Sequence, residues 1–419
     1  MISKTDQLLK EFINLHPKYI DLSLSRLEIL LNKLDNPHHQ LPPTIHIAGT
    51  NGKGSTLSFI KNILEQNNYS VHTYTSPHLE KFRERISLNN KTINANKLLR
   101  CLENVKKINH NNPITFFEIT TAAAFVLFAQ HKADFLILET GLGGRLDATN
   151  IIPKKMISVI TAIDIDHQEF LGKTIKKITN EKLGIIKDYE NVVIAKQKNE
   201  VQKYIYKKLK GKKNIYHFKK DYRFIPIQRN KFSYEFGNYK KVLSNPSLEG
   251  KHQIENASTA ITTAILLKRN NYSIRLDSLA KSILMTKWPG RIEKINFKNK
   301  FIIFDGSHNL SGAEKLNDYL KTNKIKPITI FGMLNNKNIE GFLSTLKKNI
   351  DTLYPIQIPD ETNALNKNEI FNIAKKLNIK SLLKPNLKAI NASIIKTTNK
   401  YILITGSLYL IGKIRKNYL

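Results

Sequence analysis

The chain has almost no cysteine: Cys101 is the only one among its 419 residues. A single cysteine excludes an internal disulfide and a zinc site built from several thiolates, and it is typical of a reducing compartment. Long apolar runs are also missing, because the longest, residues 122–129, is far too short to span a bilayer. The first ten residues lack the apolar core of a signal peptide. We therefore expect a soluble, cytoplasmic protein without a membrane partner.

Acidic residues are scarce relative to basic ones, with 34 Asp and Glu against 67 Lys and Arg and a formal net charge of +33. One interpretation of such an excess is a nucleic-acid-binding surface. However, basic pairs such as Lys154 with Lys155 and Lys240 with Lys241 are scattered and form no stripe with interleaved aromatic residues. We interpret the charge as a composition-wide bias and expect no nucleic-acid partner, although a basic surface still attracts ATP and acidic substrates.

The length of the chain is sufficient for two domains, each with its own core. Strand and helix patterns alternate on both sides of residues 288–291, which predicts a parallel α/β sheet in each half. Trp288, Pro289, Gly290 and Arg291 interrupt the helical pattern, and we expect the interdomain linker to follow them. The predicted domains are residues 1–293 and 294–419.

The most informative stretch is residues 44–56, Thr-Ile-His-Ile-Ala-Gly-Thr-Asn-Gly-Lys-Gly-Ser-Thr. It predicts a short apolar strand, a turn through glycines, and a helix over residues 53–66. Glycine N–H groups, the helix N-terminus and Lys53 together favour a polyphosphate, and Ser55 or Thr56 would place a hydroxyl near its metal ion. The loop departs from the usual phosphate-loop pattern at Ile47 and Gly54, so a plain glycine turn is the alternative interpretation.

Polar residues follow three further predicted strands. Ser76 follows the predicted strand 71–75, Glu139 follows the predicted strand 135–138, and His167 comes after the predicted strand 157–161. Ligands of open parallel sheets bind beyond the carboxyl ends of the strands, and a carboxylate at the tip of a buried strand is costly without a cation. These residues therefore predict a metal–phosphate site. Histidine is an uncommon magnesium ligand, so His167 alternatively marks a second metal.

The glycine loop resembles the nucleotide loop of the Mur ligase superfamily and, within it, of the folylpolyglutamate synthase/dihydrofolate synthase family. Further motifs of that family occur in the same order along the chain: residues 21–24, 115–118, 146–148, 181–184 and 305–309. Leu183 stands where the family has Ala, and Leu310 stands where it has Pro. The resemblance extends over most of the chain, from Asp21 to about Gly406.

The resemblance implies a Mur-ligase-like N-terminal P-loop ATPase domain with a parallel-rich sheet and a smaller, Rossmann-like α/β C-terminal domain on the glutamate side. It also implies an ATP-dependent amide ligase that joins L-glutamate to dihydropteroate, to folates, or to both. The substrate carboxylate would be activated as an acyl phosphate, with one or two Mg²⁺ ions, ATP as co-substrate, and a monomer as the expected state.

The same resemblance assigns roles to individual residues. The catalytic residues would be Lys53, Lys182 (as a carbamate) and His308. The ATP-binding residues would be Thr50, Asn51, Gly52, Lys53, Gly54, Ser55, Asn256, Arg291 and Asp305. The pterin-binding residues would be Asp21, Leu22, Ser23, Leu24, Thr115, Phe116, Phe117, Glu118, Leu146, Asp147 and Ala148. The metal ligands would be Ser76, Glu139 and His167.

Other interpretations stay open at this point. From the residues alone, Asp21 is a helix cap, Phe116 and Phe117 belong to a core, and Lys182 is a solvated lysine. Another Mur-type ligase, acting on a cell-wall precursor, would share the nucleotide loop, although the pterin-pocket segments argue against it. A basic, ATP-binding nucleic-acid protein would show strongly salt-dependent binding.

Overall fold

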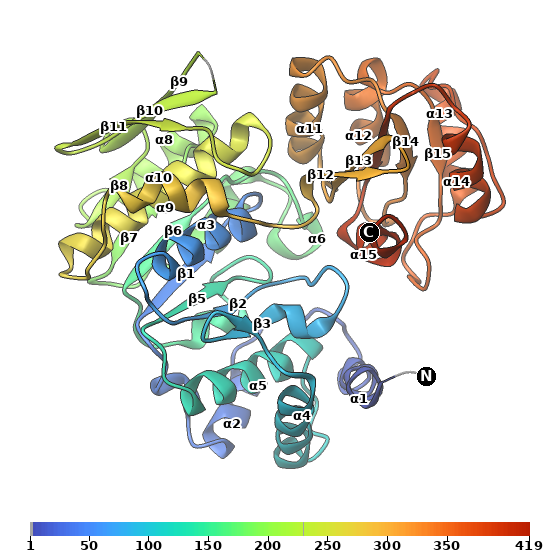
Figure 1. Cartoon of the computed structure of the whole chain (residues 1–419). Coiled ribbons are helices and arrows are strands. Elements are labelled where there is room, and N and C mark those ends of the chain that lie inside the picture. Colours follow the sequence, from blue (N-terminus) through green and yellow to red (C-terminus); the bar gives the residue numbers. More distant parts are fainter. Residues whose placement is uncertain (1–2, 229) are drawn as a thin grey trace. The chain divides into compact units, whose positions relative to one another are not determined.

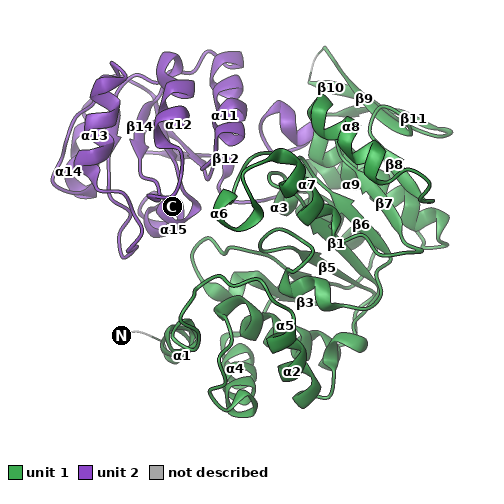
Figure 2. Ribbon diagram, turned by 180° about the vertical axis from the view of Figure 1, so that it is seen from behind, with its two compact units in different colours: residues 1–245, 255–286 green, residues 246–254, 287–419 purple. Residues whose placement is uncertain are grey.

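The computed structural model describes residues 3–228 and 230–419. The chain forms two compact units, which Figure 2 colours separately: residues 1–245 with 255–286, and residues 246–254 with 287–419. The predicted boundary after residue 293 falls inside a strand, β12 (Arg291–Phe297). The segment after Arg291, which we expected to be a linker, is therefore part of a sheet, because it pairs along its length with the next strand.

Unit 1 is built around an eight-stranded sheet with the order β4-β3-β2-β5-β1-β6-β7-β8 (Figure 1). From β2 to β8 along this order, each strand is parallel to its neighbour, whereas β3 pairs in the antiparallel sense with both β2 and β4. β1 and β5 are buried along their whole length, as predicted for apolar strands that are covered on both faces. The strands are β1 (Thr44–Ala48), β2 (Val71–Tyr74), β3 (Ile86–Leu88), β4 (Lys91–Thr92), β5 (Phe135–Glu139), β6 (Ile157–Ile160), β7 (Asn191–Ile194) and β8 (Ile215–His217).

Two apolar clusters hold the helices of unit 1 against this sheet. The larger joins α1, α2, α4 and α5 to side chains of β2 and β5, and the smaller joins α6, α7 and α8 to β6 and β7. Nearly every residue of α5 is buried, as its apolar sequence predicts. The helices are α1 (Lys4–Ile13), α2 (Ser25–Lys33), α3 (Lys53–Glu65), α4 (Ala95–Asn109), α5 (Phe116–Gln130), α6 (Gln168–Leu171), α7 (Ile175–Leu183), α8 (Asn199–Lys208), α9 (Lys251–Arg269) and α10 (Ser278–Met285), with 3₁₀ turns η1 (Pro37–His39), η2 (Phe82–Arg85) and η3 (Ala148–Ile151).

A second, three-stranded antiparallel sheet completes unit 1, with β10 between β9 and β11. Its buried Tyr234 hydroxyl lies 2.7 Å from the Thr262 hydroxyl of α9, which ties the small sheet to that helix. Its strands are β9 (Tyr222–Ile227), β10 (Lys231–Phe236) and β11 (Tyr239–Ser244).

Unit 2 contains a five-stranded sheet with the order β12-β13-β16-β14-β15. The second parallel sheet is confirmed, with β12 as an additional antiparallel edge strand. The remaining strands are β13 (Lys300–Asp305), β14 (Ile328–Phe331), β15 (Leu353–Pro355) and β16 (Tyr401–Thr405). The helices are α11 (Leu310–Thr322), α12 (Ile339–Leu346), α13 (Lys367–Lys376), α14 (Leu387–Ile395) and α15 (Leu408–Ile414), with 3₁₀ turns η4 (Lys347–Asn349) and η5 (Arg415–Asn417).

The strand order of unit 1 creates a topological switch point at β1. The chain leaves β1 through α3 toward β2 on one side, whereas β5 and β6 lie on either side of β1. Parallel sheets bind ligands at the carboxyl edge of such a point. The loops after β1, β2, β5 and β6 therefore meet at this edge. None of the helices formed by the described residues is long and apolar enough to cross a membrane.

Candidate active site

The glycine loop after β1 is bound to the segment that follows β6. The backbone N–H groups of Thr50 and Asn51 donate to Ala162 O at 2.9 and 3.1 Å. Gly49 is required for this close approach, because a Cβ at that position would lie 1.9 Å from Thr161 Oγ1. The strand and helix predicted around the loop are confirmed as β1 and α3.

Gly52 brings a distant helix to the same loop. It has a φ of +91°, which favours glycine, and a Cβ there would lie 2.5 Å from Asn256 Oδ1 in α9. Two residues predicted to bind ATP therefore lie side by side, although about 200 positions separate them along the chain. Gly54 and Ser55 follow in the buried first turn of α3.

Two lysines share one carbonyl oxygen of this loop. Lys53 Nζ donates to Gly49 O at 3.1 Å, and Lys182 Nζ from α7 donates to the same oxygen at 3.0 Å. Lys182 is only 4% exposed, which contradicts its alternative interpretation as a solvated lysine. Burial, together with the positive charge of Lys53, lowers the pKa of Lys182 to about 7, although Asp166 and other carboxylates oppose the shift. Lys182 is therefore substantially neutral near pH 7.

The structure brings together two of the three predicted metal ligands. Glu139, at the tip of β5, pairs with Ile47 of β1 and is 5% exposed. The backbone N–H of Ser76 donates to Glu139 Oε2 at 3.1 Å. A side-chain hydroxyl and a carboxylate, both hard oxygen donors, thus belong to neighbouring residues at the edge of the sheet that carries the glycine loop.

His167, the third predicted ligand, lies beside an acid of its own loop. It is not at a strand tip but immediately before α6, with a φ of +50°. Its Nε2 is 4.0 Å from Asp166 Oδ2, and its backbone N–H donates to Asp166 Oδ1. The described residues contain no group of three or more His, Cys, Asp and Glu side chains arranged to hold a metal.

Asp21 and Glu118, both predicted to bind the pterin, are joined by an arginine that the sequence reasoning left without a role. Arg26 Nη1 donates to Asp21 Oδ2 at 2.9 Å, and its Nε and Nη2 donate to the two oxygens of Glu118 at 3.2 and 3.1 Å. Glu118 also accepts the N–H and hydroxyl of Thr115, both at 2.7 Å, as a capping box of α5. Arg26 thereby fixes the segment before α2 to the start of α5. The other predicted residues of that segment lie nearby: the Ser23 hydroxyl is hydrogen-bonded to that of Ser25, Leu22 packs on the cluster of α6 and α7, and Leu24 directly precedes α2.

The two predicted pterin-binding phenylalanines contact different partners. Phe117 reaches Gly141, where a Cβ would lie 2.6 Å from its ring, and it stacks on Tyr74. Phe116 stacks on Tyr19 and meets Phe82 edge-on, with ring centroids 6.2 and 5.9 Å apart. The first turn of α5 is therefore connected both to the loop after β5 and to the segment after β2.

Asp147, in the loop after β5, is the most buried of the predicted site carboxylates. It is 2% exposed and accepts the N–H of Leu142 at 2.7 Å and the N–H and hydroxyl of Thr149 at 3.0 and 2.5 Å. Burial raises the pKa of Asp147, although these hydrogen bonds oppose the shift. Because the Thr149 hydroxyl donates to Asp147, it accepts from His46 Nε2 at 2.8 Å. The flanking Leu146 and Ala148 complete the predicted segment.

The predicted residues of unit 2 gather around Gly306. Asp305 ends β13, is 4% exposed, and accepts the N–H groups of Ile292 and Ser307, each at 3.1 Å. Burial raises the pKa of Asp305, while Arg291 opposes the shift. His308 Nδ1 donates to Gly306 O at 3.2 Å, and a Cβ on Gly306 would lie 3.0 Å from Arg291 Nη1. The three residues thus form one local group.

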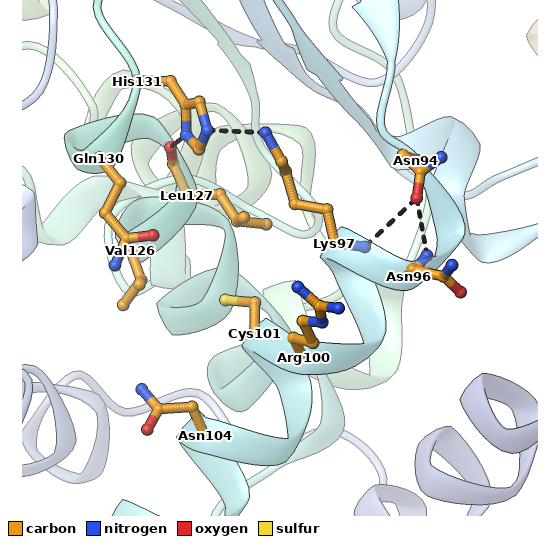
Figure 3. A pocket seen from close by; sticks show the side chains of 10 residues that line it. All are labelled: Asn94, Asn96, Lys97, Arg100, Cys101, Asn104, Val126, Leu127, Gln130 and His131. Carbon is orange, nitrogen blue, oxygen red and sulfur yellow. Dashed lines mark hydrogen bonds between the residues drawn. The ribbon is translucent and has the colours of Figure 1, made fainter.

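A cavity of about 450 Å³ beside α4 and α5 is separate from all these predicted residues. Figure 3 shows that Lys97 and His131 meet across it, and Lys97 Nζ donates to His131 Nε2 at 2.9 Å. None of the residues that line it is a predicted site residue: Asn94, Asn96, Lys97, Arg100, Cys101, Asn104, Val126, Leu127, Gln130 and His131.

Comparisons with known proteins match both halves of the chain. The family model described as Mur ligase middle domain matches residues 47–264, and the one described as dihydrofolate synthetase, C-terminal domain, matches residues 290–417. A Bacillus subtilis dihydrofolate synthase/folylpolyglutamate synthase is 33% identical over 415 residues, which cover 94% of each chain.

Solved structures match over almost the whole length. Escherichia coli FolC in complex with DHPP and ADP has a TM-score of 0.88 and 25% identity, covering 99% of this chain and 97% of that one. A Yersinia pestis bifunctional folylpolyglutamate synthase/dihydrofolate synthase complexed with AMPPNP and Mn ion has a TM-score of 0.84 and 25% identity, covering 98% of each chain. The predicted fold class is therefore confirmed.

Proposed function

We propose, from the premise that this chain belongs to the dihydrofolate synthase/folylpolyglutamate synthase family, how its residues carry out ATP-dependent ligation. The enzyme joins L-glutamate to the carboxylate of dihydropteroate, of folates, or of both, and releases ADP and phosphate. The observation that carries the assignment of the site is the meeting of Lys53, Lys182 and Asn256 at one glycine loop. That loop lies at the switch point of a parallel sheet, where ligands of such sheets bind.

The nucleotide is held by this loop. The N–H groups of residues 52–55, the N-terminus of α3 and Lys53 supply positive charge for the triphosphate, while Thr50 and Asn51 fix the loop to Ala162. Asn256, beside Gly52, is the adenine contact in this proposal.

Ser76 and Glu139 fit a magnesium ion. Mg²⁺ is usually held by one or two carboxylates together with substrate phosphates rather than by a cage of protein ligands. One carboxylate and one hydroxyl at the same sheet edge as the glycine loop match that chemistry. When bound, the ion neutralises phosphate charge, and His167 is the further ligand of this ion or of a second one.

The chemistry consists of two balanced transfers. A carboxylate oxygen of the pterin substrate attacks the γ-phosphorus, the bond to the β-phosphate oxygen breaks, and ADP leaves. The glutamate amine then attacks the acyl carbon, loses a proton, and expels phosphate. Two anions meet in the first step, so the contribution of the protein is positioning and positive charge rather than a nucleophile. His308 acts beside the incoming glutamate in this proposal, and residues 294–419 form the glutamate side.

Lys182 is proposed to act as a carbamate. Its neutral amine attacks carbon dioxide, a C–N bond forms, and one proton is released, so that a cation-forming side chain becomes an anion able to help hold magnesium. The lowered pKa of Lys182 supports this proposal, because only the neutral amine reacts.

The pterin is bound by the segments that Arg26 and Gly141 hold together, namely residues 21–24, 115–118 and 146–148. Tight positioning of these segments matters, because water must be excluded from the acyl phosphate. We expect the protein to act as a monomer, which size-exclusion chromatography with light scattering can measure.

The test of the proposed function is a coupled assay of ADP release with ATP, magnesium, L-glutamate and either dihydropteroate or tetrahydrofolate. ADP release should require both glutamate and a pterin substrate, and mass spectrometry should detect the glutamylated product. Release that ignores both pterins would contradict the assignment. Binding to RNA or DNA that weakens steeply with salt would instead favour the nucleic-acid alternative.

A further inference from the structure

Arg85 occupies an unusual position for an arginine. It ends η2, and its carbonyl oxygen accepts the N–H of Thr75 at 2.9 Å, which places it across from the carboxyl end of β2. Thr75 precedes the predicted metal ligand Ser76. The Arg85 side chain is nevertheless buried, with the residue only 6% exposed. Arginine is almost never buried to this extent unless it is paired.

The guanidinium of Arg85 is surrounded by rings rather than by acids. Its central carbon lies 5.2 Å from the centroid of Phe82 and 5.7 Å from that of Phe116, and its Nε donates to His78 Nδ1 at 3.0 Å. Within residues 3–228 and 230–419, Arg85 forms no ion pair, since no carboxylate oxygen lies within 4.0 Å of its guanidinium nitrogens. Aromatic faces offset only part of the cost of burying a charge.

Two carboxylates close in sequence to Arg85 or to Phe116 have other partners. Glu84, adjacent in sequence, accepts the N–H groups of Leu79, Glu80 and Lys81 at 2.9, 3.1 and 2.7 Å, so it closes its own loop. Glu118, in the first turn of the same helix as Phe116, is paired with Arg26. The Arg85 guanidinium is therefore contacted by His78 and by two aromatic rings, and neither of these carboxylates is left to neutralise its charge.

We propose that Arg85 binds the carboxylate of the pterin substrate, the group that becomes the acyl phosphate. The inference rests on the proposed function. Arg85 touches Phe116, which belongs to the predicted pterin-binding segment, and its backbone pairs with the residue before Ser76. A flat aromatic substrate that lies along Phe116 and ends in a carboxylate near the metal passes this guanidinium. The planar fork of arginine matches a carboxylate with two parallel hydrogen bonds.

The experiment compares binding of two ligands to the full chain without ATP or magnesium. One ligand is dihydropteroate, and the other is its analogue in which hydrogen replaces the carboxylate. The wild type should bind dihydropteroate roughly 10- to 100-fold more tightly than the analogue, as expected for a charge-assisted hydrogen bond in a buried site. In Arg85→Gln this ratio should fall to near one, mainly through weaker binding of dihydropteroate.

Arg83→Gln is the matched control, because Arg83 carries the same charge two residues away but is exposed. It should keep the wild-type ratio. Arg85→Lys keeps the charge without the fork and should fall between the two. If Arg85→Gln does not fold, Arg85→Lys decides: a ratio below that of the wild type supports the inference, and an unchanged ratio, or a wild-type ratio near one, overturns it.

Two other results would also overturn it. The first is full discrimination between the ligands by Arg85→Gln. The second is a change in the KM for ATP alone in the assay of ADP release, which would assign Arg85 to the phosphates. Failure of the proposed function is distinct from both, because the wild type would then bind neither pterin ligand and would release no pterin-dependent ADP.

Discussion

Replacing Lys182 with methionine tests the electrostatics of the site independently of the reaction. Folding lowers the pKa of Lys182 from 10.5 to about 7, chiefly through burial and then through Lys53. Between these two pH values the unfolded chain holds a proton that the folded chain lacks. Wild-type stability relative to Lys182→Met should therefore fall by roughly 1.4 kcal/mol for each pH unit from pH 10.5 down to pH 7.

Below pH 7 the difference should become constant, because both states then hold the proton. The full penalty is about 5 kcal/mol, the product of the shift and the free energy per unit. Methionine fills similar volume without a charge, so Lys182→Met should be the more stable protein at pH 7 while losing activity. Between pH 7 and pH 9 the gap between the two proteins, meaning the difference in their free energies of unfolding, should narrow by about 2 kcal/mol.

Urea unfolding of both proteins at pH 6, 7, 8 and 9, in buffers depleted of carbon dioxide, measures this gap. Lys176→Met is the matched control, since Lys176 is exposed on the same helix, and its gap to wild type should not change with pH. Parallel curves for wild type and Lys182→Met would refute the reasoning about the lowered pKa. In the same buffers, bicarbonate should restore wild-type activity and leave Lys182→Met inactive, whereas no effect of bicarbonate would contradict the carbamate.

Three further substitutions test other parts of the site. Glu139→Gln should abolish ADP release and leave the urea midpoint unchanged, whereas near-normal turnover would remove Glu139 from the metal site. Gly49→Ala should lower stability by about 1 to 3 kcal/mol in urea unfolding, because its Cβ would lie 1.9 Å from Thr161 Oγ1. Glu118→Gln should lower the free energy of unfolding by about 3 kcal/mol, because Arg26 loses its buried partner. It should also raise the KM for the pterin but not the KM for ATP; a pterin KM equal to that of the wild type would separate this ion pair from substrate binding.

The sequence predicted the strand that carries Glu139 because residues 135–138 form a continuous apolar run. β5 has the predicted position to within one residue at each end, since burial on both faces favours apolar residues along such a strand. The helix that carries Lys182 ends at Leu183. There Gly184 packs against Arg145, where a Cβ would lie 2.3 Å from Arg145 Cβ, and a contact of this kind between distant segments has no local signal.

Strand order and the paired arginine of the site were beyond the reach of the sequence. Nothing in the local pattern of β1 indicates that β5 and β6 flank it, because that order is decided by how the covering helices pack. Arg26 lies five residues after Asp21, a spacing that many surface arginines share, and its partner Glu118 is 92 positions away. The linker after Arg291 was expected because residues 288–291 interrupt the helical pattern, whereas these residues are followed by β12, whose pairing with β13 has no local signal.

The two lysines on Gly49 O show why the site gains from a change of charge at Lys182. Two ammonium groups on one carbonyl repel each other, and burial adds to that cost, so folding removes the proton from the more buried one. A carbamate keeps one N–H, so it can still donate to Gly49 O while its new carboxylate extends beyond the nitrogen. The Lys53 ammonium, which repels an ammonium at Lys182, attracts the carbamate. The carbamate also offers a further oxygen ligand to the ion that Ser76 and Glu139 are proposed to hold. On this reasoning Lys53→Met should weaken carbamate formation at Lys182 at a given bicarbonate concentration for two reasons. It removes the attraction to the carbamate and, because Lys53 lowers the pKa of Lys182, it also lowers the neutral fraction of the amine. Unchanged or stronger carbamate formation in Lys53→Met would contradict this account of the two lysines.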